Sequence, residues 1–350
     1  MIEASGLTRT FKARKREVHA VRGVDLTVEE GEIVGFLGPN GAGKTTTLRM
    51  LTTLLRPTAG TAMVAGADLL RDPVGVRRRI GYVPQAIGQT MGGTDNQAKI
   101  IEELHDQAAL YRIGKADGAR RADLLLNQLD LGGLGDRLVK TLSGGQRRRL
   151  EIALGLVHEP PIVFLDEPTT GLDPQSRSNL WDHIRGLRTD LGTTVFLTTH
   201  YLEEADALCD RVIIIDNGVT VASGTPDALK RRVSGDVVTL RVSGAEDATA
   251  RAQALLDAQP IVRDVVPADG DLRLTVEHGE EALPVLLRVL DGAGLLISSI
   301  SLSRPTLDDV FLTLTGRSLR DDSPSAAAAH GAGPAAQPDL ATASAAPAKE

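Results

Sequence analysis

A glycine-rich segment between residues 38 and 46 has the composition of a loop that binds phosphate. It consists of Gly38, Pro39, Asn40, Gly41, Ala42, Gly43, Lys44, Thr45 and Thr46. Gly41 and Gly43 allow backbone N–H groups to turn inward around a β-phosphate, and the helix expected from residue 44 adds its positive end. Lys44 would bridge the β- and γ-phosphates, and the Thr45 hydroxyl would be a Mg²⁺ ligand. A GxGxxG dinucleotide loop matches neither these glycines nor Lys44, so the segment predicts a P-loop.

Two adjacent carboxylates could complete such a site. Asp166 and Glu167 follow the apolar stretch 162–165, which predicts a buried parallel strand. The end of that strand would face the sheet edge where open α/β folds bind ligands. We expect Asp166 to hold Mg²⁺ through water, and Glu167 to act as the general base that orients and deprotonates the attacking water. The residues at 168–173, Pro-Thr-Thr-Gly-Leu-Asp, argue against a simple pair of surface charges.

A second candidate anion site lies farther along the chain. Ser143, Gly144, Gly145 and Gln146 directly precede a helix-like stretch that ends at residue 156. A glycine-rich turn at a helix N-terminus binds anions, although the same pattern alone is also a common helix cap. One chain cannot place two distant anion sites on one γ-phosphate, whereas two chains arranged head to tail can. The pattern therefore predicts that a second copy of the chain is a partner.

Three further positions are candidates from their spacing. Gln85 follows the strand-like stretch 80–84 and could reach the metal or the attacking water, and a surface glutamine is the alternative. His200 ends the strand-like stretch 195–199, parallel to the strand of Asp166, so it is expected to touch the γ-phosphate. Phe11 could stack on adenine, or it could be an ordinary core aromatic.

Composition narrows the class of protein. The chain has 350 residues, 42% of them hydrophobic and 24% charged, which predicts a soluble globular protein of one large or two domains. A net charge of −7 gives no electrostatic footprint for nucleic acid, and we interpret the basic clusters 12–16 and 77–79 as solvated faces. The single cysteine, Cys209, excludes an intramolecular disulfide and fits a reducing cytoplasm. No apolar run approaches the ~18 residues that span a bilayer, so a membrane process would require another polypeptide to span it.

The order of elements predicts two folded units. Residues 1–230 are expected to form one α/β domain, with short strands near 2–7 and 24–28 separated by a basic loop, and a polar, helical stretch at 86–141. Residues 235–316 follow a βαββαβ order, which favours a small ferredoxin-like domain. They end in an amphipathic helix at 307–314. Residues 321–350 are Ala-, Pro-, Gly- and Ser-rich, and we expect them to be disordered.

Over residues 1–230 the chain resembles the ATP-binding-cassette ATPases. The motifs occur in the family's order: the P-loop at 38–45, Gln85, the signature Leu-Ser-Gly-Gly-Gln at 142–146, the acidic strand at 162–167, the loop at 171–173, and His200. The resemblance implies a RecA-like P-loop NTPase core with an antiparallel β-subdomain and a helical subdomain at about 86–155. ATP would lie between the P-loop of one copy and residues 143–146 of the other, with Asp173 crossing the same interface.

The second half narrows the resemblance. The segments 198–206 and 304–312 are similar to those of the daunorubicin-resistance type of exporter ATPase, so the resemblance covers about 1–316. It implies an ATPase bound peripherally to the cytoplasmic face of the membrane that energises export of drug-like or lipid-like cargo through a separate multi-span permease. Two features depart from the family pattern: Phe11 stands where tyrosine is commoner, and the Gly/Gln-rich stretch 86–98, where the permease would dock, matches poorly.

One alternative function remains from the sequence. A cassette ATPase could act without a membrane partner on ribosomes, DNA or cofactor assembly. Members of that kind usually carry two cassettes with a charged linker, a long coiled coil or zinc modules, and this chain has one cassette and no sustained heptads. The C-terminal domain could be a brace between two copies, which we favour, or a module that binds a regulatory ligand.

Overall fold

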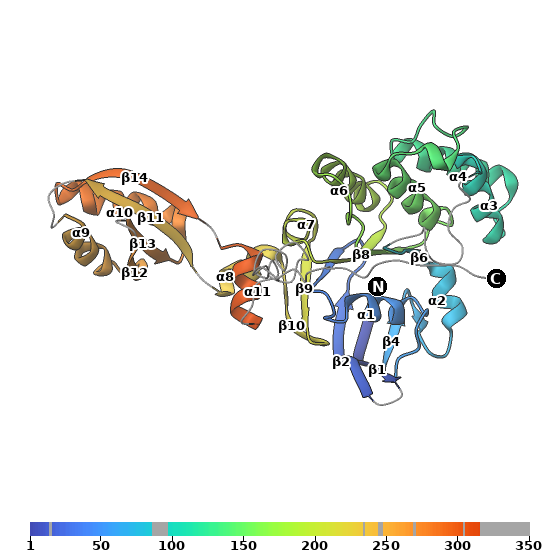
Figure 1. Ribbon diagram of the computed structural model, residues 1–350, viewed down its shortest axis with the longest axis horizontal. Helices are drawn as coiled ribbons and strands as arrows, with labels where there is room; N and C mark the ends of the chain where they lie inside the picture. The colour runs from blue at the N-terminus through green and yellow to red at the C-terminus, as the bar shows by residue number, and fades with distance from the viewer. Residues whose placement is uncertain are drawn as a thin grey trace, which may run out of the picture.

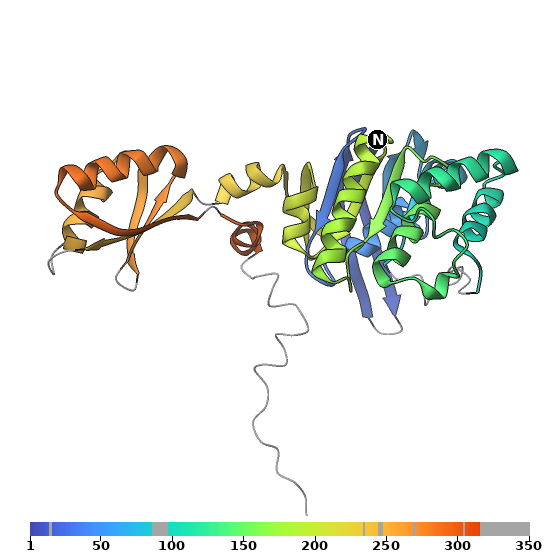
Figure 2. The same cartoon turned by 90° about the horizontal axis from the view of Figure 1, so that it is seen from above.

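The computed structural model describes residues 1–13, 16–85, 97–233, 235–243, 248–268, 271–303 and 305–315. The described part has an elongated outline, with a large unit formed by the first two thirds of the chain and a smaller unit beyond it (Figures 1 and 2). The predicted tail at 321–350 and most of the stretch 86–98 lie outside the described residues.

The large unit is built around a central, mostly parallel sheet. Its strands are β3 (Ile33–Leu37), β6 (Ile80–Val83), β7 (Ile162–Asp166), β8 (Thr194–Thr199), β9 (Arg211–Asp216) and β10 (Val219–Gly224), in the order β10-β9-β3-β8-β7-β6. All neighbours are parallel except β10 and β9. β3, β7 and β8 are buried along their whole length, which is why they are nearly continuous apolar runs. The predicted parallel strands at 162–165 and 195–199 are confirmed.

A second, antiparallel sheet in the large unit is formed by strands from the N-terminal part of the chain. It has the order β2-β1-β4-β5, with β1 (Ile2–Ala13), β2 (Arg16–Val28), β4 (Ala59–Val64) and β5 (Ala67–Asp68). The prediction of short strands separated by a basic loop was wrong, because β1 and β2 pair as far as Ala13 and Arg16. The outer part of this hairpin is half-exposed, so its polar residues face water while remaining in the ladder.

The large unit has eight α-helices in the described residues. They are α1 (Lys44–Leu51), α2 (Pro73–Arg79), α3 (Ile100–Leu110), α4 (Lys115–Gln128), α5 (Gly144–Leu156), α6 (Pro174–Thr189), α7 (Leu202–Leu208) and α8 (Pro226–Val233). Three of them, α3, α4 and α5, lie together at one end (Figure 1). α3, α4 and α5 share one apolar core through residues such as Leu104, Leu125 and Leu150. None of the helices in the described ranges is long and apolar enough to cross a bilayer.

The smaller unit has the βαββαβ order expected from the sequence. β11 (Asp236–Ser243), α9 (Ala248–Asp257), β12 (Val262–Ala268), β13 (Asp271–Val276), α10 (Gly279–Gly292) and β14 (Leu296–Ser303) form an antiparallel sheet of order β12-β13-β11-β14. Both helices lie on one face of this sheet (Figure 2), where Leu240, Leu274 and Leu286 are buried. This is the ferredoxin-like arrangement.

The last helix returns to the large unit. α11 (Leu307–Thr315) packs against α8 and α7, and its apolar residues Leu307, Val310 and Phe311 join the core that contains Leu208 and Leu229. The sequence pattern grouped this helix with residues 235–316. An amphipathic helix must bury its apolar stripe, but its spacing does not say which neighbour covers it.

Phe311→Ala is therefore expected to destabilise the large unit. Phe311 is 0% exposed, and truncating a buried phenylalanine costs about 3–5 kcal/mol. The midpoint of urea denaturation would fall. Leu312→Ala is the matched control, since Leu312 on the same helix is 48% exposed and would have little effect. Equal effects of the two changes would contradict the packing of α11.

Candidate nucleotide site

The glycine-rich loop connects β3 to α1 with a backbone that its glycines make possible. β3 ends at Leu37 and α1 begins at Lys44. Gly41 and Gly43 have φ angles of 81° and 107°, in the region that favours glycine. A Cβ atom at Gly43 would also lie only 2.6 Å from the carbonyl oxygen of Ala20 on β2. The loop thus has the strand–turn–helix context that its sequence predicted.

Lys44 points back into the loop rather than out to solvent. Its ammonium donates to the carbonyl oxygens of Gly38 (2.7 Å) and Pro39 (3.1 Å), and its Nζ lies 3.5 Å from Oε1 of Glu167. Lys44 is 5% exposed. Burial lowers the pKa of Lys44 below its usual value, while Glu167 and Asp166 oppose that shift. A buried cation held in this way is suited to binding phosphate oxygens.

Asp166 and Thr45 meet at the carboxyl edge of the sheet. The hydroxyl of Thr45 donates to Oδ1 of Asp166 over 3.2 Å, and Thr198 at the end of β8 donates to the same oxygen over 2.6 Å. A hydroxyl and a carboxylate beside a phosphate-binding loop are hard oxygen donors, which fit Mg²⁺ bound together with phosphate and water. Thr45 and Asp166, two of the three predicted metal ligands, thus lie together.

Glu167 is the centre of a ring of polar groups. Its Oε2 accepts hydrogen bonds from the side-chain amide of Gln85 (2.7 Å) and from the hydroxyl of Thr170 (3.2 Å). Its Oε1 lies 3.2 Å from Nδ1 of His200 and faces Lys44. The structure therefore brings these residues into one cluster. Gln85, the third predicted metal ligand, donates to Glu167, the predicted base.

The backbone of Glu167 adopts an unusual conformation. Its φ angle is 44°, which is uncommon for a residue other than glycine and costs of order 1–3 kcal/mol. Its N–H donates to the carbonyl oxygen (3.1 Å) and the hydroxyl (3.0 Å) of Thr198. This strained turn aims the carboxylate away from the strand and towards Lys44 and His200.

The surroundings of Glu167 favour its charged form. Burial raises the pKa of Glu167, but His200, the ammonium of Lys44 and the hydroxyl of Thr170 lower it, so this pKa lies below the usual glutamate value. A carboxylate that is ionised and surrounded by donors is in the state that a general base requires.

The signature residues lie at a different place. Ser143 caps α5: Gln146 N–H donates to Ser143 Oγ (3.3 Å), and Ser143 N–H donates to Gln146 Oε1 (3.1 Å). Gly144 lies near Leu172, which precedes α6, and Gly145 lies near Ser176 in the first turn of α6. Within the part of the chain that the structure describes, no hydrogen bond or ion pair joins 143–146 to the P-loop. The structure thus leaves these two predicted anion sites apart within one chain.

Asp173 lies beside the signature residues. It caps α6, accepting from the N–H (2.9 Å) and the hydroxyl (2.7 Å) of Ser176. Those two hydrogen bonds lower the pKa of Asp173 below its usual value. The carboxylate is therefore held near Gly145, on the surface where the signature turn is exposed.

Phe11 lies on the β1–β2 hairpin beside the loop. It pairs with Val18 on β2, two residues from Ala20, whose carbonyl lies next to Gly43. The ring is 39% exposed, and the guanidinium of Arg9 lies 4.7 Å from its centroid. Phe11 is therefore not a core aromatic, and one face of its ring is occupied by a cation.

Two hydroxyls in this cluster were not among the residues predicted from the sequence. Thr198 contacts both Asp166 and the backbone of Glu167, and Thr170 contacts the Glu167 carboxylate. Their positions in the sequence could have identified them, because Thr170 follows β7 and Thr198 lies near the end of β8, and both strands reach the same sheet edge.

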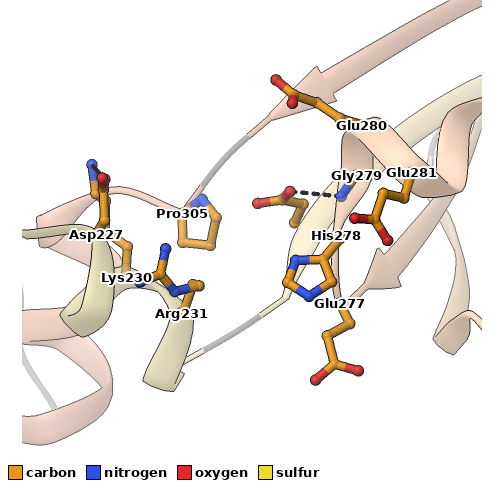
Figure 3. Close-up of a pocket in the computed structure, with 10 residues that line it drawn as sticks. Asp227, Lys230, Arg231, Glu277, His278, Gly279, Glu280, Glu281 and Pro305 are labelled. Atoms are coloured by element: carbon orange, nitrogen blue, oxygen red, sulfur yellow. Dashed lines mark hydrogen bonds and ion pairs between the residues drawn. The ribbon is translucent and has the colours of Figure 1, made fainter.

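A separate pocket lies between the two units (Figure 3). It has a volume of about 290 Å³ and is lined by Lys230 and Arg231 of α8 on one side and by Glu277 and Glu281 near α10 on the other. Lys230 is paired with Asp206 and Asp227, and Asp236 accepts from the N–H of Gly279 over 2.7 Å. The pocket contains none of the predicted nucleotide-site residues.

Two family models match the chain. Residues 21–170 match the model described as "ABC transporter", and residues 224–315 match the model described as "ATP-binding protein DrrA1-3-like, C-terminal domain". A dimeric ATP-binding cassette in a post-hydrolysis state, bound to ADP and Pi, is a similar solved structure: it is 26% identical, with a TM-score of 0.57, over 64% of this chain and 98% of that chain.

Curated relatives match along most of the chain. The daunorubicin/doxorubicin resistance ATP-binding protein DrrA of Streptomyces peucetius is 44% identical over 93% of this chain and 96% of its own length. The doxorubicin resistance ATP-binding protein DrrA of Mycobacterium tuberculosis is 40% identical over 90% and 93%. The Nod factor export ATP-binding protein I of Cupriavidus metallidurans is 38% identical over 86% and 94%.

The fold, the motif order and these matches agree on one class of enzyme. The central sheet with its P-loop is that of the nucleotide-binding cassettes, and the second unit matches the domain that follows the cassette in the DrrA group. The chain therefore belongs to the ATP-binding-cassette transporter ATPases, in the group of the daunorubicin- and doxorubicin-resistance ATP-binding proteins.

Proposed function

We propose that the chain binds ATP with Mg²⁺ between two copies and uses its hydrolysis to energise export of drug-like or lipid-like cargo. The export passes through a separate membrane permease at the cytoplasmic face. One observation carries this proposal: a clustered catalytic half-site around Glu167 and a separate capped signature turn lie on the same chain. The names of the relatives, which state drug resistance and Nod factor export, support an export role.

In this proposal, each residue of the half-site has a chemical role that follows from its position. The loop N–H groups and Lys44 would hold the β- and γ-phosphates. Thr45 and Asp166 would hold Mg²⁺, which would supply charge neutralisation at the phosphates. Glu167 accepts the proton of the attacking water, and Gln85 and His200 orient the base and the water. Phe11 offers its free face to adenine. Apart from Phe11, the residues given these roles lie at the carboxyl edge of the central sheet.

The second half of the site comes from a second copy in this proposal. Ser143, Gly144, Gly145 and Gln146 present the N-terminus of α5, with Asp173 beside them. An exposed, glycine-rich helix N-terminus binds anions. A head-to-tail dimer brings this turn to the γ-phosphate held by the P-loop of the other copy. Closing of the dimer on ATP then supplies the motion that the permease uses.

A pull-down tests the export role. Tagged full-length protein is recovered from detergent-solubilised membranes, and the co-purifying proteins are identified by mass spectrometry. A stoichiometric multi-span membrane protein is expected. The untagged chain is the control for adventitious recovery. Capture of ribosomal or DNA-repair proteins from the soluble fraction, with no membrane protein, would instead support a cassette ATPase without a permease.

A further inference from the structure

Arg148 on α5 is a charged residue that lies almost wholly inside the large unit. It is 6% exposed, and its neighbour Glu151, one turn along the same helix, is 8% exposed. Charged side chains are rarely buried to this extent unless they are paired and hydrogen-bonded. The sequence placed Arg148 in the basic run 147–149, next to the signature, without a role of its own.

The guanidinium of Arg148 donates to four acceptors from three parts of the chain. Nε donates to the carbonyl oxygen of Pro168 (2.9 Å), Nη2 to that of Asp166 (3.1 Å) and Nη1 to that of Pro84 (2.7 Å). Nη1 also donates to Oε2 of Glu151 over 2.8 Å. Arginine offers a rigid, planar set of donors, so these bonds set the relative positions of the groups that accept them.

The three carbonyls belong to the catalytic segments. Asp166 and Pro168 flank Glu167, whose strained φ angle must be maintained by its neighbours. Pro84 directly precedes Gln85, which donates to the Glu167 carboxylate. Arg148 thus holds the backbone on both sides of Glu167. It also holds the backbone directly before Gln85, which donates to Glu167.

The same side chain begins on the signature helix. Arg148 lies two residues beyond Gln146, in the second turn of α5. A shift of the α5 N-terminus would therefore move the guanidinium and with it the carbonyls beside Glu167 and Gln85. The N-terminus of α5 is also the part of this chain that faces the nucleotide of the second copy in the proposed dimer.

We propose that Arg148 is a positioning residue that couples the signature helix of one chain to the base and the glutamine of the same chain. When the nucleotide bound to the second copy contacts the N-terminus of α5, Arg148 positions Glu167 and Gln85 of the chain to which that α5 belongs. This inference rests on the head-to-tail dimer of the proposed function. It assigns Arg148 no contact with ATP.

Arg148→Met alone would leave Glu151 buried without its partner and could unfold the protein. The test therefore uses Arg148→Met/Glu151→Leu, which removes both buried charges and replaces them with apolar groups. Such paired replacements are often neutral or stabilising. We expect an unchanged melting temperature and an unchanged Kd for ATP, because the P-loop is intact. We expect kcat to fall by about 10- to 100-fold, as misplacement of reacting groups does.

Two single variants complete the test. Glu151→Gln keeps an acceptor for Arg148 and all three carbonyl bonds, so its kcat is expected to stay close to that of the unaltered chain. Arg148→Lys keeps the charge but lacks the planar fork, so it is expected not to restore kcat. Wild-type kcat in the folded double variant would overturn the role of Arg148.

The outcome for the unaltered chain separates the two proposals. If the unaltered chain hydrolyses ATP and the double variant does so equally well, the role of Arg148 fails and the proposed function stands. If the unaltered, folded chain has no ATP turnover at all, the proposed function fails and the role of Arg148 in that turnover fails with it.

Discussion

Glu167→Gln is expected to lower ATP turnover by about 10²–10⁴-fold, the usual contribution of a general base, while ATP still binds. The change keeps the size of the side chain but removes the carboxylate that takes the proton from water. It also removes the negative charge 3.5 Å from Lys44, so the ammonium stays free to hold phosphate. Bound ATP that is not hydrolysed would hold two copies together.

Two measurements check this result. Steady-state phosphate release gives the turnover, and light scattering after gel filtration with and without ATP gives the mass of the complex. Glu30→Gln is the matched control, because Glu30 is an exposed carboxylate in the turn between β2 and β3. Normal turnover in Glu167→Gln would remove Glu167 from its role as base. A variant that is inactive but monomeric with ATP would count against the head-to-tail dimer.

Lys44→Ala is expected to weaken ATP binding by about 30- to 4,000-fold. Truncating one partner of a buried, hydrogen-bonded charge contact costs about 2–5 kcal/mol, and each 1.4 kcal/mol is tenfold in affinity. The change removes the ammonium that donates to the carbonyl oxygens of Gly38 and Pro39, although Pro39 still accepts from the N–H of Ala42. It also removes the ammonium whose charge lowers the pKa of Glu167, so that pKa is expected to rise.

Isothermal titration with a non-hydrolysable ATP analogue measures this effect directly. Lys115→Ala is the control, since Lys115 is an exposed lysine at the start of α4. If Lys44→Ala bound the analogue as tightly as the unaltered chain does, the glycine-rich loop would not be the phosphate site.

The class of the protein and the framework of its candidate site could be predicted from local sequence patterns. Gly41, Gly43 and Lys44 define the loop locally, because backbone conformation and donor type depend on residues close in sequence. Asp166 and His200 could be assigned to one edge because the carboxyl ends of parallel strands meet there. The βαββαβ order likewise followed from local periodicity, and the structure confirms its sheet order.

The contacts between these parts depend on how segments far apart in sequence pack together. The hydrogen bonds of Gln85 and Thr170 to Glu167, the strained backbone of that residue, and the four bonds of Arg148 join segments far apart in sequence. α11 has an apolar stripe that any exposed apolar surface could cover, and the fold places it on α8 and α7. Sequence spacing specifies which side chains share a face, whereas the partner across that face depends on how the whole chain packs.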